Sequence, residues 1–202
     1  MKGQTKIVSV LIIVLIASAA IGMVTPWTYN MIQKKQDMKS VDDAYNFFQT
    51  LDDTIRNVVQ NGGEESLHLE VPGKFEIFPE SISHELNNSI TFMMESKVSL
   101  IAEGDWIPLN TPNTNEVATL GIDPPSVIFG KAQESGDRIN IQYRLWYRAL
   151  NDTSGNLYKI VLNTSTDDIT STTNGFIRIE RLGSEKITNG KTLTITKINI
   201  IV

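Results

Sequence analysis

One uncharged stretch near the N-terminus constrains this chain more than any other feature. Residues 7–33 carry no charged side chain, and the denser part, Ile7–Val24, is apolar apart from Ser9, Ser18 and Gly22. As a helix rising about 1.5 Å per residue, the stretch covers roughly 40 Å, which exceeds the roughly 30 Å hydrocarbon thickness of a bilayer. The sequence therefore predicts an N-terminal helix long enough to cross a membrane.

Two local features modify this helix. Trp27 and Tyr29 lie where an aromatic belt would meet the lipid headgroups. Pro26 has no N–H and disfavours helical geometry at Thr25, so we expect a kink or a short melted stretch near Pro26.

A second helical pattern follows the apolar stretch. Ser40 and Asp43 have the spacing of a capping box, and Asn61-Gly62-Gly63 is a stop signal. Apolar residues at 3-4-3-4-3 spacing form one face: Val41, Ala44, Phe48, Leu51, Ile55 and Val58. We expect an amphipathic helix extension over residues 34–63 that covers one side of the following domain. A sharper alternative is that its apolar face also contacts neighbouring subunits.

From residue 64 on, apolar residues alternate with polar ones, which is typical of strands. With no helix between the strands, the pattern predicts an antiparallel β-sandwich over residues 64–202 and an α+β fold overall. Pro72-Gly73 predicts a hairpin turn, residues 103–125 a loop, and the C-terminal strand is expected to pair inside a sheet. The expected strands are 67–71, 75–77, 89–94, 98–102, 126–132, 138–149, 157–162, 175–182 and 192–202.

The strand over residues 138–149 has the clearest pattern, with one apolar and one polar face. Arg144, Trp146 and Arg148 lie on the polar face, and arginine and tryptophan favour interfaces. We interpret this face as the most binding-like surface of the chain. The alternative is that the arginines pair with Glu or Asp on neighbouring strands.

Composition excludes several functions. The net charge is −5, so no basic stripe is available for nucleic acid, and the absence of cysteine excludes disulfides and thiolate chemistry. The two histidines, His68 and His84, are expected at the surface. The sequence has none of the common catalytic or phosphate-binding motifs, so we expect neither an enzyme nor a cofactor or metal site. Oxygen-rich turns at residues 151–156 and Asp167-Asp168 leave calcium binding as a minor alternative.

Three N-x-[ST] triplets begin at Asn87, Asn151 and Asn163. Such triplets accept glycans on extracellular proteins, although they are equally common in solvated turns. The lysines on the two sides of the apolar stretch are too evenly divided to settle its orientation. We place the β domain outside the cell on the basis of the triplets and the Thr- and Asn-rich strands.

The N-terminal residues leave three interpretations open. A charged start before an apolar run is typical of a secretory signal peptide, of a membrane anchor or of a prepilin leader. Ala17-Ser18-Ala19 would suit signal-peptide cleavage, but apolar character continues beyond it.

Lys2-Gly3-Gln4 followed at once by the apolar helix resembles the class III signal of archaeal type IV pilins and archaellins. The resemblance covers about 60 residues, and Val8 stands where many pilins carry Glu. It implies that a prepilin peptidase removes residues 1–3 by cutting between Gly3 and Gln4.

The resemblance further implies that residues 4–33 form the filament-core helix. The expected function is therefore a structural subunit of a pilus-like extracellular filament, held in the membrane before the assembly machinery polymerises it. The residues expected to pack against neighbouring copies are Leu15, Ile16, Ala17, Ser18 and Gly22. The alternative is an uncleaved single-pass membrane protein with an outward binding domain, as part of an envelope or archaellum machine.

Overall fold

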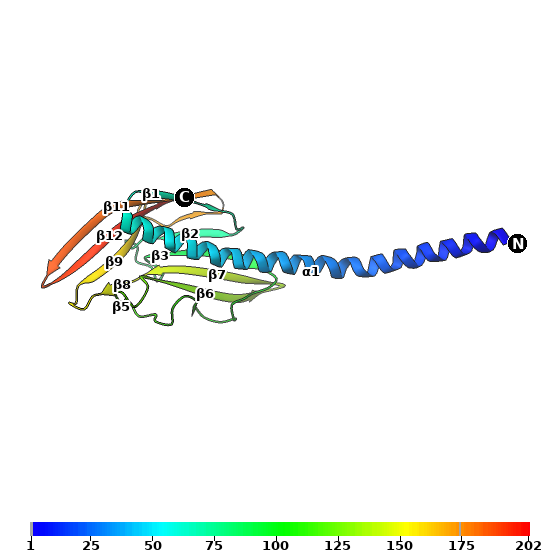
Figure 1. The fold of residues 1–202 in the computed structure, drawn as a ribbon, viewed down its shortest axis with the longest axis horizontal. Coiled ribbons are helices and arrows are strands. Elements are labelled where there is room, and N and C mark those ends of the chain that lie inside the picture. Colours follow the sequence, from blue (N-terminus) through cyan, green and yellow to red (C-terminus); the bar gives the residue numbers. More distant parts are fainter. Residues whose placement is uncertain (1, 174) are drawn as a thin grey trace.

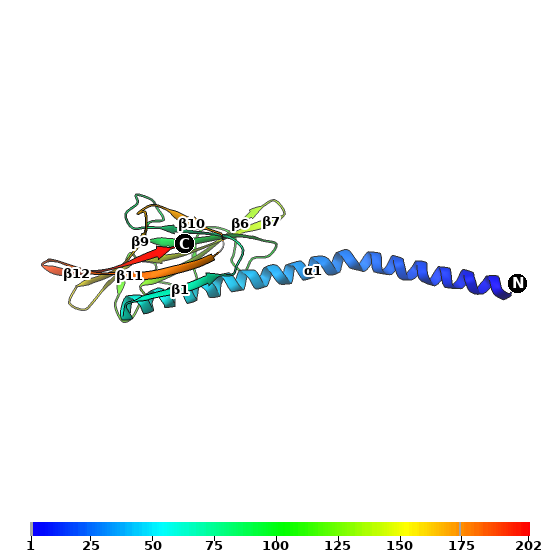
Figure 2. The same ribbon diagram turned by 90° about the horizontal axis from the view of Figure 1, so that it is seen from above.

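The computed structural model describes residues 2–202 apart from residue 174, and it leaves the side chains of residues 2–9 and 189 undescribed. One long helix extends far beyond a β-rich domain (Figure 1). The domain consists of two sheets and packs against one side of the C-terminal part of the helix only (Figure 2). This confirms the predicted α+β architecture with a β-sandwich.

The helix α1 (Lys2–Asn61) is continuous over 60 residues, or roughly 90 Å. The capping-box spacing of Ser40 and Asp43 does not mark a helix start, because Ser40 lies inside α1 and the extension joins the apolar stretch without a break. The predicted stop is confirmed, since Gly62 and Gly63 have φ values of 76° and 85° and the Gly62 N–H bonds the Val58 carbonyl at 2.9 Å.

Pro26 lies inside α1 without melting it. The hydroxyl of Thr25 donates to the Ile21 carbonyl at 2.7 Å, and that of Thr28 donates to the Val24 carbonyl at 3.0 Å. Pro26 lacks the N–H that would bond the Gly22 carbonyl, and its ring crowds the preceding turn. The helix therefore bends near its middle (Figure 2) instead of breaking.

The twelve strands of the described residues form two six-stranded sheets. Sheet 1 contains, in spatial order, β1 (Glu64–Leu69), β11 (Gly175–Asn189), β12 (Lys191–Ile201), β9 (Leu157–Thr164), β8 (Ala149–Asn151) and β5 (Val117–Thr119). Sheet 2 contains, in spatial order, β10 (Thr170–Thr172), β2 (Lys74–Phe78), β3 (Ser89–Ser96), β7 (Arg138–Tyr147), β6 (Ser126–Ser135) and β4 (Ile107–Pro108).

Most strand pairs are antiparallel, as predicted, but β9 pairs with β12 and β5 with β8 in parallel. The chain crosses from β9 through β10 in sheet 2 before it returns as the β11–β12 hairpin, so β12 reaches β9 from a distant point of the sequence. The C-terminal strand β12 lies between β11 and β9, which confirms that it pairs inside a sheet.

The predicted hairpin at Pro72-Gly73 is wrong. β1 pairs with β11 in sheet 1, whereas β2 pairs with β3 and β10 in sheet 2. The turn therefore carries the chain from one sheet to the other. It passes so close to the Phe92 ring that a Cβ on Gly73 would lie 2.3 Å from a ring carbon.

The strand predicted over residues 98–102 is also absent. Ser96 Oγ donates to the Val98 carbonyl at 2.7 Å, and Ser99 Oγ donates to the Ile101 carbonyl at 2.7 Å. These local bonds replace ladder bonds and bend the chain. Conversely, the predicted loop 103–125 contains the short strands β4 and β5, and the short strand β10 was not predicted.

The core lies between the two sheets and the C-terminal part of α1 (Figure 2). All six residues of the predicted apolar face are at most 1% exposed, which confirms that this face covers the domain. We call residues 41–58 the docked half of α1.

Candidate functional site

The most unusual surface of the molecule is the N-terminal half of α1. We call Val10–Ile32 the stem, because every residue in it is exposed and it projects away from the domain (Figure 1). Fourteen large apolar or aromatic side chains of the stem are between 45% and 80% exposed. They are Val10, Leu11, Ile12, Ile13, Val14, Leu15, Ile16, Ile21, Met23, Val24, Trp27, Tyr29, Met31 and Ile32.

The stem has the length and composition of a membrane span. Its 23 residues rise roughly 34 Å, slightly more than the hydrocarbon core of a bilayer. None of the apolar window that qualifies α1 as a candidate span is buried within the chain. A core helix of a soluble protein would be buried, so the chain does not use the stem for its own packing.

The serine and threonine hydroxyls at Ser18, Thr25 and Thr28 are satisfied within the helix. Ser18 Oγ donates to the Val14 carbonyl at 2.8 Å, in the same way as Thr25 and Thr28 near the bend. Such bonds lower the cost of placing a hydroxyl in an apolar environment. The stem is therefore suited to surroundings without water.

The residues predicted to pack against other helices are all accessible. Leu15 and Ile16 are 71% and 63% exposed, and Ala17, Ser18 and Gly22 are exposed as well. A Cβ added to Gly22 would meet no atom within 4 Å, so no intramolecular contact requires a glycine there. Beside the bend, a shallow apolar groove of about 550 Å³ is lined by Ala20, Ile21, Val24, Thr25, Thr28, Tyr29 and Ile32.

A polar junction marks where the stem meets the domain. The backbone N–H of Lys97 donates to Asp37 Oδ2 at 2.8 Å, and the Lys97 ammonium group donates to Gln33 Oε1. The loop after β3 therefore holds α1 one turn before the docked half begins. These bonds fix the direction in which the stem leaves the domain.

The predicted processing residues lie before the stem, at the N-terminal end of α1. Lys2, Gly3 and Gln4 form the first turn of α1, and Met1 lies outside the described residues. Cleavage after Gly3 stays a prediction.

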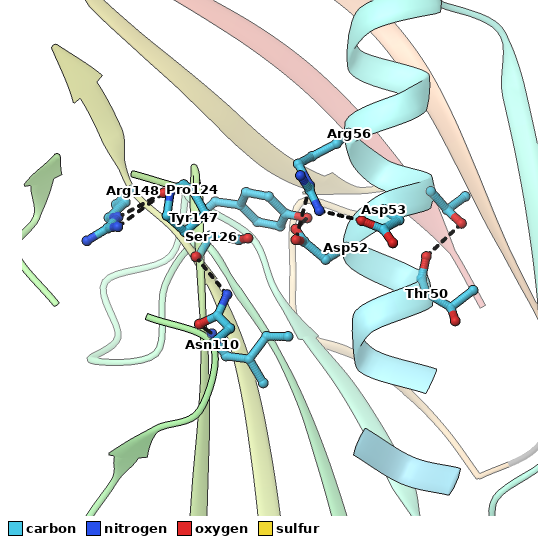
Figure 3. A network of polar contacts seen from close by, with 11 residues as sticks. Thr50, Asp52, Asp53, Arg56, Asn110, Pro124, Ser126, Tyr147 and Arg148 are labelled. Atoms are coloured by element: carbon cyan, nitrogen blue, oxygen red, sulfur yellow. Dashed lines mark hydrogen bonds and ion pairs between the residues drawn. The ribbon is translucent and has the colours of Figure 1, made fainter. Parts of the chain in front are cut away.

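The docked half carries a buried polar cluster that the sequence did not reveal (Figure 3). Tyr147 on β7 donates its hydroxyl to Asp52 Oδ1 at 2.8 Å, and Arg56 Nε lies 3.1 Å from Asp52 Oδ2. Burial raises the pKa of Asp52 although Arg56 and the hydrogen bonds act to lower it. Burial and the neighbouring Asp52 carboxylate raise the pKa of Tyr147 well above its ordinary value.

Further buried hydrogen bonds join α1 and the two sheets. The Tyr143 hydroxyl donates to the Val41 carbonyl at 3.1 Å, and burial raises the pKa of Tyr143 to about 12. Asn88 donates to the Tyr147 and Ile160 carbonyls, both at 2.9 Å, and so ties sheet 2 to sheet 1. Asn88 has a φ of 52°, a conformation that Asn tolerates better than most residues. These contacts stabilise the fold by joining α1 and the two sheets to one another.

The structure corrects the interpretation of the polar face of residues 138–149. Arg148 is 1% exposed and donates to the carbonyls of Asn113, Asn115 and Pro124, so it fastens the long loop instead of facing solvent. Arg144 donates to the Glu85 carbonyl and to Ser89 Oγ. The alternative of pairing with carboxylates on neighbouring strands is therefore also wrong for these two arginines. Trp146 remains half-buried on the outer face of β7.

The glycan acceptors lie at different places in the domain. Asn87 precedes β3, Asn151 ends β8, and Asn163 lies within β9; all three are half-buried. Glycan attachment at these three asparagines stays a prediction.

The two histidines are exposed, as expected: His68 packs beside Phe176, and His84 stacks on Phe78. In the turn after β8, the Asp152 carboxylate accepts bonds from the N–H groups of Ser154 and Asn156, both at 2.8 Å. Among the described residues, no three His, Cys, Asp or Glu side chains come together as a metal site would require.

No family model, curated protein or solved structure matches this chain. The function must therefore be argued from the geometry of the stem and the domain.

Proposed function

We propose that the protein is the structural subunit of a type IV pilus-like archaeal filament, which waits in the membrane through its stem before assembly. The observation that carries this proposal is the exposed apolar stem, which continues without a break into the buried half of the same helix. In the proposal, a prepilin peptidase cuts after Gly3 and Gln4 becomes the mature N-terminus.

The stem cannot remain bare in water. Leaving its fourteen large side chains exposed costs roughly 20–40 kcal/mol, at about 1.5–3 kcal/mol for each side chain. The stem must therefore be covered, either by lipid or by the stems of other copies. A subunit whose stem leaves lipid and packs against the stems of other copies moves from the membrane into the filament.

The side chains of the stem suit such an exchange. Small residues allow helix backbones to approach closely. Gly22 in a helix interior costs about 1 kcal/mol relative to alanine, and no contact within this chain offsets that cost. Close packing against a neighbouring stem would do so. The β domain would then form the outside of the filament, and the bonds of Lys97 to Gln33 and Asp37 would set its angle to the stem.

The alternative function is an uncleaved single-pass anchor that carries the β domain outside the cell. The length of the stem favours it, because roughly 34 Å suits a single crossing with Trp27 and Tyr29 near one interface. In this case the stem never leaves lipid, and the domain acts by binding.

A charged substitution in the stem tests the proposal. In cells that produce the protein, Leu15→Lys should abolish filaments seen by electron microscopy, because a lysine cannot be covered in a dry bundle of stems. Leu182→Lys is the matched control, since Leu182 is a 53% exposed leucine on β11, and it should leave filaments unchanged. Intact filaments from Leu15→Lys would contradict the proposal.

Sequencing the N-terminus of the protein from the native envelope separates the interpretations. A start at Gln4 supports the pilin-like subunit, and a start at Met1 or Lys2 supports the anchor. A start just after Ala19 would identify a signal peptide and contradict both.

A further inference from the structure

The outer face of sheet 2 carries a second surface that the filament proposal does not use. In β7 the even-numbered residues point away from the core, because Ile141, Tyr143 and Leu145 are buried. The register places Phe129 opposite Arg144 and Lys131 opposite Gln142, so these residues share the outer face. We call the face formed by Trp106, Phe129, Lys131, Asn140, Gln142 and Trp146, together with Arg144, the aromatic strip.

The aromatic strip combines rings with cations. The Phe129 and Trp146 rings lie 6.4 Å apart, Arg144 lies 5.9 Å from the Trp146 ring, and the Lys131 ammonium lies 5.9 Å from the Trp106 ring. All of these residues are half-buried, so part of each ring faces solvent.

Among the residues that the structure describes, neither cation of the strip forms a direct ion pair, although the Glu85 carboxylate interacts electrostatically with Arg144. The ion pairs found among the described residues include neither Lys131 nor Arg144. This is unusual in a chain whose net charge is −5, because carboxylates outnumber cations overall. Glu95 lies opposite Asn140 on the same face, but it is paired with Arg138. Lys131 and Arg144 therefore remain available to attract an anionic partner.

The amide side chains of the strip have poor partners. The Asn140 and Gln142 amide nitrogens lie 3.3 and 3.7 Å from the Met93 sulfur, and a thioether is a weak acceptor. Both amides would gain by donating to hydroxyl or carboxylate oxygens of a ligand. Since Asn140 and Trp146 are six residues apart, the strip extends roughly 20 Å along β7. An extended ligand, such as an oligomer, fits the aromatic strip better than a compact small molecule does.

We propose that the aromatic strip binds an acidic polysaccharide, a chain of sugars in which some carry carboxylates. Rings stack on the C–H faces of sugars, amides bond their hydroxyls, and the two cations attract their carboxylates. A protein partner fits less well, because a protein interface needs an apolar, fully covered centre, whereas here the outer positions between the rings are filled by Lys131, Asn140 and Gln142. Two cations are too few for a polyphosphate chain.

The test uses the full chain in detergent micelles and two probes of equal length, a galacturonic acid oligomer and an uncharged glucose oligomer. By titration calorimetry we expect the acidic oligomer to bind at least tenfold more tightly, and raising the salt concentration to weaken it. Equal affinity for the two oligomers, or no binding of either, would overturn the proposal.

Variants locate the site. Lys131→Gln should weaken binding of the galacturonic acid oligomer about fivefold, and the double variant Trp106→Ala, Lys131→Gln more than tenfold. Lys191→Gln and Phe176→Ala are matched controls, because both residues are exposed on sheet 1, and they should bind like the unaltered chain. An unchanged midpoint of urea unfolding shows that each variant is folded.

Two outcomes would count against the site. Controls that weaken binding as much as the strip variants would place the sugar elsewhere. Strip variants that bind sugar normally but no longer associate with other copies would make the strip a protein interface. The result is independent of filament formation, since Lys131→Gln leaves the stem unaltered and a failure of either proposal is visible on its own.

Discussion

The two halves of α1 belong to one continuous helix and yet have opposite surroundings. The docked half buries six apolar residues to 1% exposure or less, whereas Leu15 and Ile16 of the stem are 71% and 63% exposed. The docked half has an apolar stripe on one side, and the stem is apolar all round. A stripe is satisfied by one folded domain, but a helix that is apolar all round needs a cover on every side. The domain therefore folds around the docked half, while the apolar surface of the stem stays uncovered by the rest of the chain.

The halves also differ in how they treat polar groups. The docked half bonds the Thr50 and Thr54 hydroxyls to its own carbonyls, but in addition it places Asp52 against Tyr147 of β7, a polar contact that joins distant elements. The stem directs its hydroxyls back to its own carbonyls. A helix whose polar groups are satisfied internally can change its neighbours at little cost, which a helix tied to fixed partners cannot do.

The largest expected difference between the halves concerns apolar truncation. Phe48→Ala should lower the free energy of unfolding by about 3–5 kcal/mol, because Phe48 is fully buried and packs against the rings of Phe92 and Tyr143 in sheet 2. Leu15→Ala should change it by less than about 0.5 kcal/mol, because Leu15 touches nothing in the domain. Urea unfolding in micelles, followed by tryptophan fluorescence, measures both. Similar losses in the two variants would show that the stem contributes to the domain.

A smaller effect should appear in the pH dependence of stability. Burial raises the pKa of Asp52 above its ordinary 3.8, so the folded state resists ionisation of this carboxyl. The contribution of Asp52 to stability is therefore largest at low pH and falls as the pH rises above 3.8 through the raised pKa.

Asp52→Asn removes this titration. The unfolding free energy of the variant, relative to that of the unaltered chain, should rise between about pH 3.5 and pH 7. Asp42→Asn is the control, because Asp42 is exposed on the same helix and should not reproduce this rise. A falling difference would mean that the Arg56 ion pair outweighs burial.

The smallest effect on the domain should come from the bend. Pro26→Ala restores a backbone N–H and removes the clash with the preceding turn, so amide exchange around Gly22–Thr25 should slow and the stem should straighten. The unfolding free energy of the domain should stay within about 0.5 kcal/mol, because the bend lies outside it. Hydrogen exchange and urea unfolding measure the two quantities. A destabilised domain would show that the bend positions the docked half.

The sequence predicted local features well wherever a periodic pattern reached a core. The six residues spaced 3-4-3-4-3 are the buried face of α1, and alternation in β7 assigned Ile141, Tyr143 and Leu145 to the core. Sequence-based prediction failed where a pattern shows which face of a strand is buried but does not show which other strand or sheet that strand pairs with. Alternation on both sides of Pro72-Gly73 suggested a hairpin, yet the two strands belong to different sheets.

The candidate sites show the same limit. The stem could be predicted from the sequence, because an uncharged apolar run of this length is typical of a helix that crosses a membrane. Arg148 was assigned to the solvent face by its position in the alternation, but the loop 113–125 folds over it and its donors bind that loop's carbonyls. The aromatic strip needed the register of β6 and β7, since Trp106, Lys131 and Trp146 are distant in sequence.

Sequence alone determined that this chain has a long apolar helix, an amphipathic continuation and a β-rich domain, because hydrophobic period and length are local properties of the chain. Tertiary structure decided that the helix runs unbroken from Lys2 to Asn61, which strands are neighbours, and which polar residues are buried. Those outcomes depend on contacts between segments that are distant in the sequence. The energies of such contacts cannot be predicted from a local pattern of residues.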